Sequence, residues 1–163
     1  MNQKRAIRLK KQDKVDILFE DAFSAARFSK LRMRSFLKPV SYLYPNFEAW
    51  LNFTFVRQMG EGERQAIVAH DGNRVYGCAL LKVSSDENKI CTFFVHPDAR
   101  EQGLADDMMR LSLERFDNCP IISVSEDRTA ELQPLLKKHG FKVYTSVEGM
   151  YWPHKSEHFF IAN

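Results

Sequence analysis

Apolar residues recur with a helical period in the first part of the chain and with a strand period in the second, and the change falls near residue 64. Residues 6–10, "AIRLK", alternate between apolar and polar types and predict a short first strand. In residues 14–28 the apolar positions recur every three or four residues, which predicts a helix. These positions are Val15, Leu18, Phe19, Ala22 and Phe23. Two more helices are predicted over residues 29–37, ending before Pro39, and over residues 45–59.

From residue 64 onward, short β-rich runs are separated by turn sequences. The runs 64–71, 74–84 and 89–96 are joined by the tight turns "GN" and "SDEN", a pattern typical of an antiparallel meander. A helix over 104–116, a strand over 120–125, a helix over 128–140 and two strands over 141–147 and 156–162 are predicted to follow. We therefore expect an α/β (α+β) fold, in which one mixed, mainly antiparallel central sheet is flanked by helices.

The 163 residues contain no Gly/Ser/Pro-rich linker, low-complexity tract or internal repeat, so a single domain over 1–163 is expected. Within it, 1–63 is expected to form a helical region and 64–163 the core with the C-terminal strands. No apolar run approaches the roughly 18 residues of a membrane span, and the first residues lack the apolar segment of a signal peptide. The three cysteines have no metal-ligand spacing. We expect a cytoplasmic protein with no membrane partner and no metal.

Positive charge is concentrated near the start of the chain. Residues 1–38 hold 11 Lys and Arg against 4 Asp and Glu, whereas the remaining residues hold 13 against 17. Such a segment can contact nucleic acid, an acidic partner or an anionic substrate, but it is more commonly the solvated face of helices. We therefore do not expect nucleic acid as a partner on this observation alone.

The loop at residues 100–105, "REQGLA", joins the predicted strand over 89–96 to the helix that follows. The first turn of a helix exposes about four unpaired N–H groups and carries roughly half a positive charge, so it can bind an anion. Gly103 allows close approach of a ligand to the backbone, Ala105 is small, and Arg100 adds positive charge. The loop is either a phosphate cradle or a plain chain reversal, and this segment alone favours neither.

Three segments together resemble a known family. The strand end "FFVHP" followed by Arg100, Gly103 and Ala105 is similar to the R/Q-x-x-G-x-G/A acetyl-CoA motif of the GNAT superfamily of N-acetyltransferases. The strand "IISVS" and the helix end "LLKKHGF" resemble the next two segments of that family. The resemblance covers most of residues 64–163, and it implies a GNAT-like fold with residues 1–63 on the acceptor side.

The resemblance also implies acetyl-CoA as the acyl donor and assigns the residues that hold it. Backbone groups of Phe94 and Val95 are expected to pair with its acetyl and pantetheine portions. The strand that ends near Ser125 is expected to splay away and admit the pantetheine arm, and Arg128 to reach the phosphates. The amides expected to bind the pyrophosphate belong to Arg100, Glu101, Gln102, Gly103, Leu104 and Ala105.

Carboxylates surround this expected phosphate site. Glu101, Asp106 and Asp107 lie in the loop and in the first helical turn. Acidic side chains there complement the helix dipole, yet they would weaken phosphate binding if their charges stayed unpaired.

The sequence names no catalytic residue unambiguously. Many family members carry a tyrosine as general acid at the position occupied here by Leu136, and leucine cannot donate a proton. Tyr144 or Tyr151 could supply a phenol, or the thiolate could leave unassisted. Some relatives carry a glutamate base where this chain has Lys89, so the base candidates are Glu157, Glu148 and Asp86.

We expect an acetyl-CoA-dependent N-acyltransferase that acts on a primary amine of a small molecule, peptide or protein. The amine is expected to attack the thioester directly, and family members commonly form homodimers. Two other functions remain open at this point. One is a non-catalytic acyl-CoA sensor, which would explain why leucine replaces the family's tyrosine at position 136. The other is a nucleic-acid-associated or ribosome-associated module that uses the basic N-terminal segment.

Overall fold

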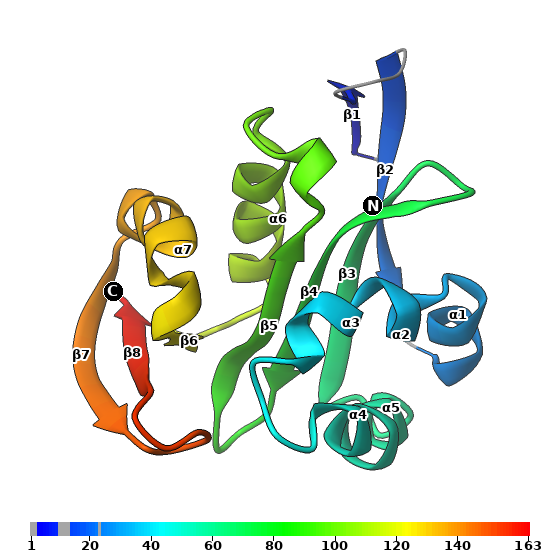
Figure 1. The fold of residues 1–163 in the computed structure, drawn as a ribbon. Helices are drawn as coiled ribbons and strands as arrows, with labels where there is room; N and C mark the ends of the chain where they lie inside the picture. Colours follow the sequence, from blue (N-terminus) through cyan, green and yellow to red (C-terminus); the bar gives the residue numbers. More distant parts are fainter. Residues whose placement is uncertain (1–2, 10–13, 23) are drawn as a thin grey trace.

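A single sheet runs through the protein. The computed structural model describes residues 3–9, 14–22 and 24–163, and the strands of these residues form one sheet in the order β1-β2-β3-β4-β5-β6-β8-β7 (Figure 1). Its only parallel pair is β5 with β6, so the mixed, mainly antiparallel sheet expected from the sequence is confirmed. The strands are β1 (Lys4–Arg8), β2 (Lys14–Ala22), β3 (Arg64–His70), β4 (Val75–Val83), β5 (Asn88–Val95), β6 (Ile121–Ser125), β7 (Phe141–Glu148) and β8 (Ser156–Ala162).

The prediction of a helix over residues 14–28 is wrong for most of that segment. Lys14–Ala22 is strand β2, which pairs with β1 on one side and β3 on the other. Ile17 and Phe19 are buried, while Leu18 between them is 37% exposed. The burial of this segment therefore alternates as in a strand. Its apolar residues also fit a three- and four-residue spacing, but pairing with β1 and β3 satisfies its backbone groups and decides for the strand. Lys10 and Phe23, which the predictions included, lie outside the described residues.

Helices cover both faces of the sheet. Apolar side chains of α1 to α5 form one core with alternate strand residues such as Leu80 and Phe94, and those of α6 and α7 form a second core with their neighbours Ala79 and Phe93. Because successive strand residues point to opposite faces, the two helix groups lie on opposite sides. The helices are α1 (Ala25–Lys30), α2 (Met33–Phe36), α3 (Lys38–Ser41), α4 (Phe47–Trp50), the π-helix η1 (Leu51–Phe55), α5 (Val56–Met59), the 3-10 helix η2 (Pro97–Ala99), α6 (Leu104–Leu113) and α7 (Glu126–Lys138).

Most remaining elements agree with the sequence predictions. The meander β3-β4-β5, the elements α6, β6 and α7, and the strands β7 and β8 are all present, and residues 45–59 are largely helical. Residues 29–37 are not one helix, because Arg32 has a left-handed φ of 56° and separates α1 from α2. Helix α2 ends at Phe36, before Pro39 as predicted, and Pro39 lies inside the first turn of α3, where its missing N–H is tolerated.

Two irregularities of β5 open the sheet at its centre. The register with β4 shifts so that Leu80 pairs with Thr92 but Leu81 pairs with Ile90, which leaves Cys91 as the extra residue of a β-bulge. Parallel pairing with β6 is limited to Lys89 with Ile121 and Ile90 with Ile122. Beyond these pairs the two strands diverge. Bulges redirect side chains and interrupt pairing, so this part of β5 has edges available to a ligand.

Candidate active site

The loop between β5 and α6 has the geometry of an anion-binding helix start. Gly103 is the residue before the first turn of α6, its φ is +79°, and no side chain caps the helix. The first N–H groups of α6 are therefore open to a ligand. Two features require glycine at this position. The positive φ is unfavourable for a residue with a Cβ, and a Cβ there would lie 2.2 Å from Nη2 of Arg5.

Strand β1 contributes to this loop, which the sequence did not indicate. The Nε of Arg5 donates to the carbonyl oxygen of Gln102 at 2.8 Å, and its Nη1 pairs with Asp107. The side chain of Gln102 bonds both the N–H and the carbonyl of Arg8. Residues about 95 positions apart in sequence thus fix the loop. No local signal could have predicted these contacts, because they depend on β1 lying beside α6.

The carboxylates near the loop are largely neutralised. Asp107 pairs with Arg5, and Asp106 lies 3.0 Å from Nζ of Lys138 and 2.7 Å from Nε2 of His139. The hydrogen bond from Lys138 holds the pKa of Asp106 below its usual value. Glu101 is exposed and has a left-handed φ of 63°. Two of the three acids that would oppose phosphate binding therefore carry paired charges.

A groove leads from this loop along the sheet between α6 and α7. Its volume is about 580 Å³. Near its β5 side, the Nε of Arg100 donates to the carbonyl of Val95 at 3.0 Å, and Glu131 bridges Arg100 and Arg128 at 3.1 Å and 3.0 Å. The groove is lined by Phe93, Val95, Arg100, Glu101, Gly103, Ala105, Asp106, Glu131, Leu132, Pro134, Leu135 and Lys138.

The other residues expected from the sequence surround the opening between β5 and β6. Phe94 is buried, and the guanidinium groups of Arg100 and Arg128 lie 5.9 Å and 5.7 Å from its ring centre. Ser125 is buried at the end of β6, where its Oγ accepts the N–H of Asp127 and caps α7. Leu104 is buried in the core as the first residue of α6 and contributes no side chain to the groove.

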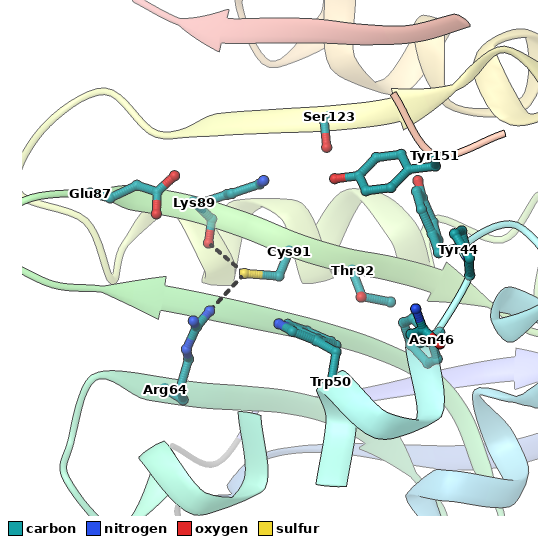
Figure 2. A pocket seen from close by; sticks show the side chains of 12 residues that line it. Tyr44, Asn46, Trp50, Arg64, Glu87, Lys89, Cys91, Thr92, Ser123 and Tyr151 are labelled. Carbon is teal, nitrogen blue, oxygen red and sulfur yellow. Dashed lines mark hydrogen bonds between the residues drawn. The ribbon is translucent and has the colours of Figure 1, made fainter. Parts of the chain in front are cut away.

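A second cavity lies on the opposite face of the sheet, under α4 (Figure 2). Its volume is about 280 Å³. It is lined by Tyr44, Pro45, Asn46, Phe47, Trp50, Arg64, Glu87, Lys89, Cys91, Thr92, Ser123 and Tyr151. Of the aromatic residues before β3, Tyr44 and Trp50 therefore face a cavity, Phe55 is buried in the core, and Tyr42 and Phe53 are 75% and 73% exposed.

Between the two cavities lies a narrow gap of about 10 Å³. A narrow space between β5 and β6 shares Phe93 and Leu132 with the groove. It shares Tyr44, Cys91, Thr92 and Ser123 with the cavity under α4. The bulge at Cys91 and the divergence of β6 thus leave a gap in the sheet that borders both cavities, here called the passage.

A buried carboxyl group and two phenols stand beside this passage. Glu157 on β8 is 3% exposed, and the hydroxyl of Tyr44 donates to its Oε1 at 3.1 Å. Burial raises the pKa of Glu157, and burial together with the nearby Glu157 raises the pKa of Tyr44. The ring of Tyr151 meets the ring of Tyr44 edge-on, with centres 5.0 Å apart, and burial raises the pKa of Tyr151.

The remaining catalytic candidates lie away from the passage. Tyr144 on β7 is 58% exposed, and its ring contacts Phe159. Glu148 and Asp86 are exposed and line neither cavity. Among the candidates weighed from the sequence, only Tyr151 and Glu157 come together beside the opening of β5.

Comparison with known proteins identifies the family. The sequence model of the acetyltransferase (GNAT) domain matches residues 41–150. The chain belongs to the GNAT acetyltransferase family. No curated protein sequence matches it. The GNAT match includes α4, the meander, the loop before α6 and all of β7. It therefore covers that loop and strand β5, which lines both cavities.

Solved structures share the GNAT fold at low sequence identity. A GNAT-family acetyltransferase from Bacillus cereus is 15% identical, with a TM-score of 0.66 over 90% of this chain and 96% of that chain. A GNAT-family acetyltransferase from Elizabethkingia anophelis, solved with acetyl-CoA bound, is 14% identical, with a TM-score of 0.61 over 90% and 97%. The ribosomal-protein-S18-alanine N-acetyltransferase of Escherichia coli is 17% identical, with a TM-score of 0.52 over 61% and 68%.

This GNAT chain departs from the common pattern at the general-acid position. Leu136 is fully buried between α7 and the sheet, so a side chain at this point of the helix packs in the core. His96 has a structural role at the end of β5, because its Nδ1 accepts the N–H of Asp98 and caps η2.

Sequence reasoning missed Arg64, which lines the cavity under α4 and is buried. It begins strand β3, where an arginine carries no distinctive pattern. Within the described ranges, no helix is long and apolar enough to cross a membrane, and no three His, Cys, Asp or Glu residues are grouped to hold a metal ion.

Proposed function

We propose that this protein is an acetyl-CoA-dependent N-acetyltransferase that transfers an acetyl group to a primary amine of a small molecule, peptide or protein. The observation that carries the proposal is the passage through the sheet at the bulge of β5. This gap of about 10 Å³ lies between a groove that begins at an open helix N-terminus and a separate, aromatic-lined cavity, and it shares lining residues with both. Two substrates can thus approach one point from opposite faces of the sheet. The whole chain, 1–163, acts as one domain in this proposal.

The residues of the groove fit coenzyme A. The free N–H groups of α6 suit the pyrophosphate, and Arg5 and Arg100 lie beside them, although each already pairs with an acid, Asp107 and Glu131. The groove of about 580 Å³ is large enough for part of the pantetheine arm. Backbone groups of Phe94 and Val95 would hold its inner end as an added strand would, once Arg100 releases the carbonyl of Val95. Acetyl-CoA supplies an activated thioester there.

The amine must be neutral to attack, so the site needs a proton acceptor. We assign this role to Glu157, which receives the proton through the hydroxyl of Tyr44. The phenol oxygen of Tyr44 accepts the amine proton while its own proton passes to Oε1 of Glu157, 3.1 Å away. Burial raises the pKa of Glu157, which makes it a stronger base than an exposed glutamate. Tyr44 need not become a free phenolate in this transfer.

We assign protonation of the leaving thiolate to Tyr151. It lines the cavity under α4, and in Figure 2 its hydroxyl points towards Ser123, across the opening between β5 and β6. Leu136 cannot take this role, because its side chain is buried and has no ionisable proton to donate. Cys91 needs no covalent role, since burial raises the pKa of its thiol and the direct attack requires no enzyme intermediate.

A melting experiment and an acceptor panel test the proposal. Acetyl-CoA at about 100 times its dissociation constant should stabilise the protein by roughly 2.7 kcal/mol. Failure of acetyl-CoA and CoA to raise the melting temperature would contradict both the enzyme and the sensor. Amine-dependent release of CoA thiol supports the enzyme, whereas binding without release from any amine or from water leaves the sensor as the better description.

The basic N-terminal segment gains no support as a nucleic-acid surface. Arg5 pairs with Asp107, and Arg27 makes two hydrogen bonds to Glu20. These charges are therefore partly satisfied within the protein. Salt-sensitive binding to RNA would be needed to revive that function.

A further inference from the structure

Arg64 is a buried cation without an acidic partner. The residue is 8% exposed, and no carboxylate of the described residues lies within ion-pairing distance of its guanidinium. Its Nε donates to Oε1 of Gln58 at 2.8 Å, and its Nη1 donates to Sγ of Cys91 at 3.2 Å. The aromatic rings of Trp50 and Phe55 each lie 6.0 Å from the guanidinium carbon.

These neighbours hold the guanidinium in place without pairing its charge, and the carboxylate of Glu87 attracts it only from beyond ion-pairing distance. A neutral amide, a thiol and two ring faces fix its orientation, but none of them carries a full negative charge. A buried charge is costly unless an opposite charge or several strong hydrogen bonds meet it. Arg64 lines the cavity under α4, so an anion in that cavity would supply the missing partner.

A second cation reinforces the positive character of the cavity. Lys89 also lines it, and no ion pair joins Lys89 to any other described residue. The acid on the same wall, Glu87, is already bound by Nζ of Lys82 at 2.8 Å. One wall of this cavity therefore presents two cations and one paired acid. A monoanion is favoured over a doubly charged phosphate monoester, because Glu87 repels the second charge.

Arg64 and the opening between β5 and β6 lie on different sides of the cavity, whereas Lys89 lies on β5, where it pairs with Ile121 of β6. Arg64 projects from β3, and Ser123 and Tyr151 border the opening near β6 (Figure 2). Strands β3 and β6 are three steps apart in the sheet order, which corresponds to about 14 Å between their backbones at the usual strand spacing. The side chains of Arg64 and Tyr151 extend into this space from opposite sides (Figure 2). A ligand that contacts both of them therefore needs several bonds between its two ends.

We propose that the acceptor is a small amino acid-like molecule whose carboxylate binds Arg64 and Lys89 while its amine, several bonds away, reaches the opening between β5 and β6. A carboxylate suits the planar guanidinium, whose outer N–H groups can bind both of its oxygens. Tyr44 and Trp50 provide an apolar wall for the body of the molecule. This inference rests on the proposed function and names the substrate class of the same site.

The test compares amines that differ only in the carboxylate. The pairs are γ-aminobutyrate with butylamine, and p-(aminomethyl)benzoate with p-methylbenzylamine, and the readout is CoA thiol release with acetyl-CoA. The acid of at least one pair is expected to have a kcat/KM about ten- to 100-fold above that of its partner, as hydrogen bonds to a charged group can provide. Equal or lower values for both acids would overturn the inference.

Variants connect the preference to the two cations. Arg64→Gln is expected to remove most of the preference for the acid over the plain amine, and Lys89→Gln should remove part of it. Lys89 is partly exposed, so this variant remains informative if Arg64→Gln fails to fold. Lys142→Gln on the exposed side of β7 is the charge-matched control and should behave as wild type. A preference that persists in both cavity variants would overturn the assignment.

A binding measurement separates this inference from the proposed function. Melting curves of the protein with CoA are recorded with p-(aminomethyl)benzoate and with p-methylbenzylamine, which requires no chemistry. A larger stabilisation by the acid in the wild type but not in Arg64→Gln supports the anion site even if no acetyl transfer occurs. An equal effect of the two compounds in the wild type contradicts the anion site even if other amines are acetylated.

Discussion

Replacement of Gly103 by alanine should weaken both the fold and the binding of acetyl-CoA. The φ of +79° costs a residue with a Cβ about 1–2 kcal/mol. The new Cβ would meet Nη2 of Arg5 at 2.2 Å, so the flexible guanidinium must leave Gln102 and Asp107. That loss costs about 0.5–1.5 kcal/mol. For a chain of this length, the sum corresponds to a decrease in melting temperature of roughly 3–14 °C.

Gly140→Ala is the matched control for this change. Gly140 has the same φ of +79°, and a Cβ there would meet no atom within 4 Å. Both variants therefore pay the same backbone cost and gain the same reduction in unfolded-state entropy. The difference between their melting temperatures isolates the displacement of Arg5, and we expect it to be about 1–6 °C.

The assay is thermal unfolding with and without acetyl-CoA. The wild type and Gly140→Ala should gain about 5–10 °C from acetyl-CoA at about 100 times its dissociation constant. Gly103→Ala should gain distinctly less at the same concentration, and Arg5→Gln should lose part of the gain without straining the loop. If Gly103→Ala kept the full gain, the loop before α6 would not hold the pyrophosphate and the reasoning about the open helix N-terminus would be refuted.

Three further predictions concern catalysis and the core. Glu157→Gln should lower kcat by about 10²–10⁴-fold while acetyl-CoA binding persists. Because burial raises the pKa of Glu157, wild-type activity should fall as the pH decreases through a value above the ordinary 4.5, and the variant should lose this acidic limb in a kcat profile. Tyr151→Phe should slow thiol release at saturating acceptor. Tyr144→Phe is the control and should match the wild type, since Tyr144 is 58% exposed on β7. Equal rates for the two variants would exclude Tyr151 as the general acid. Leu136→Tyr should destabilise the protein by about 1–3 kcal/mol without raising activity, because Leu136 is fully buried; a gain in kcat measured by thiol release would contradict this placement.

The local pattern of the sequence determined most of the fold from residue 45 onward. Alternating apolar residues and two short turns were sufficient for the meander β3-β4-β5, since hairpin turns and strand periodicity act over a few residues. The helix start at Gly103 was likewise visible, because the glycine and the strand before it lie within ten residues. The same local reasoning failed at β2, where apolar residues fit a helical and a strand spacing and pairing with β3 decides between them.

The sequence alone also defined one side of the candidate site and left the other open. The loop at 100–105 follows from a motif of consecutive residues, whereas its contacts with Arg5 and Arg8 depend on strand β1 lying beside α6. Tyr44, Arg64, Tyr151 and Glu157 come from four separate segments, and the cavity under α4 and the opening of β5 bring them together. Burial, which raises the pKa of Glu157 and encloses the unpaired guanidinium of Arg64, is a property of the packed sheet and helices. Only the tertiary structure could decide these features, because desolvation and long-range contacts are not encoded in the spacing of neighbouring residues.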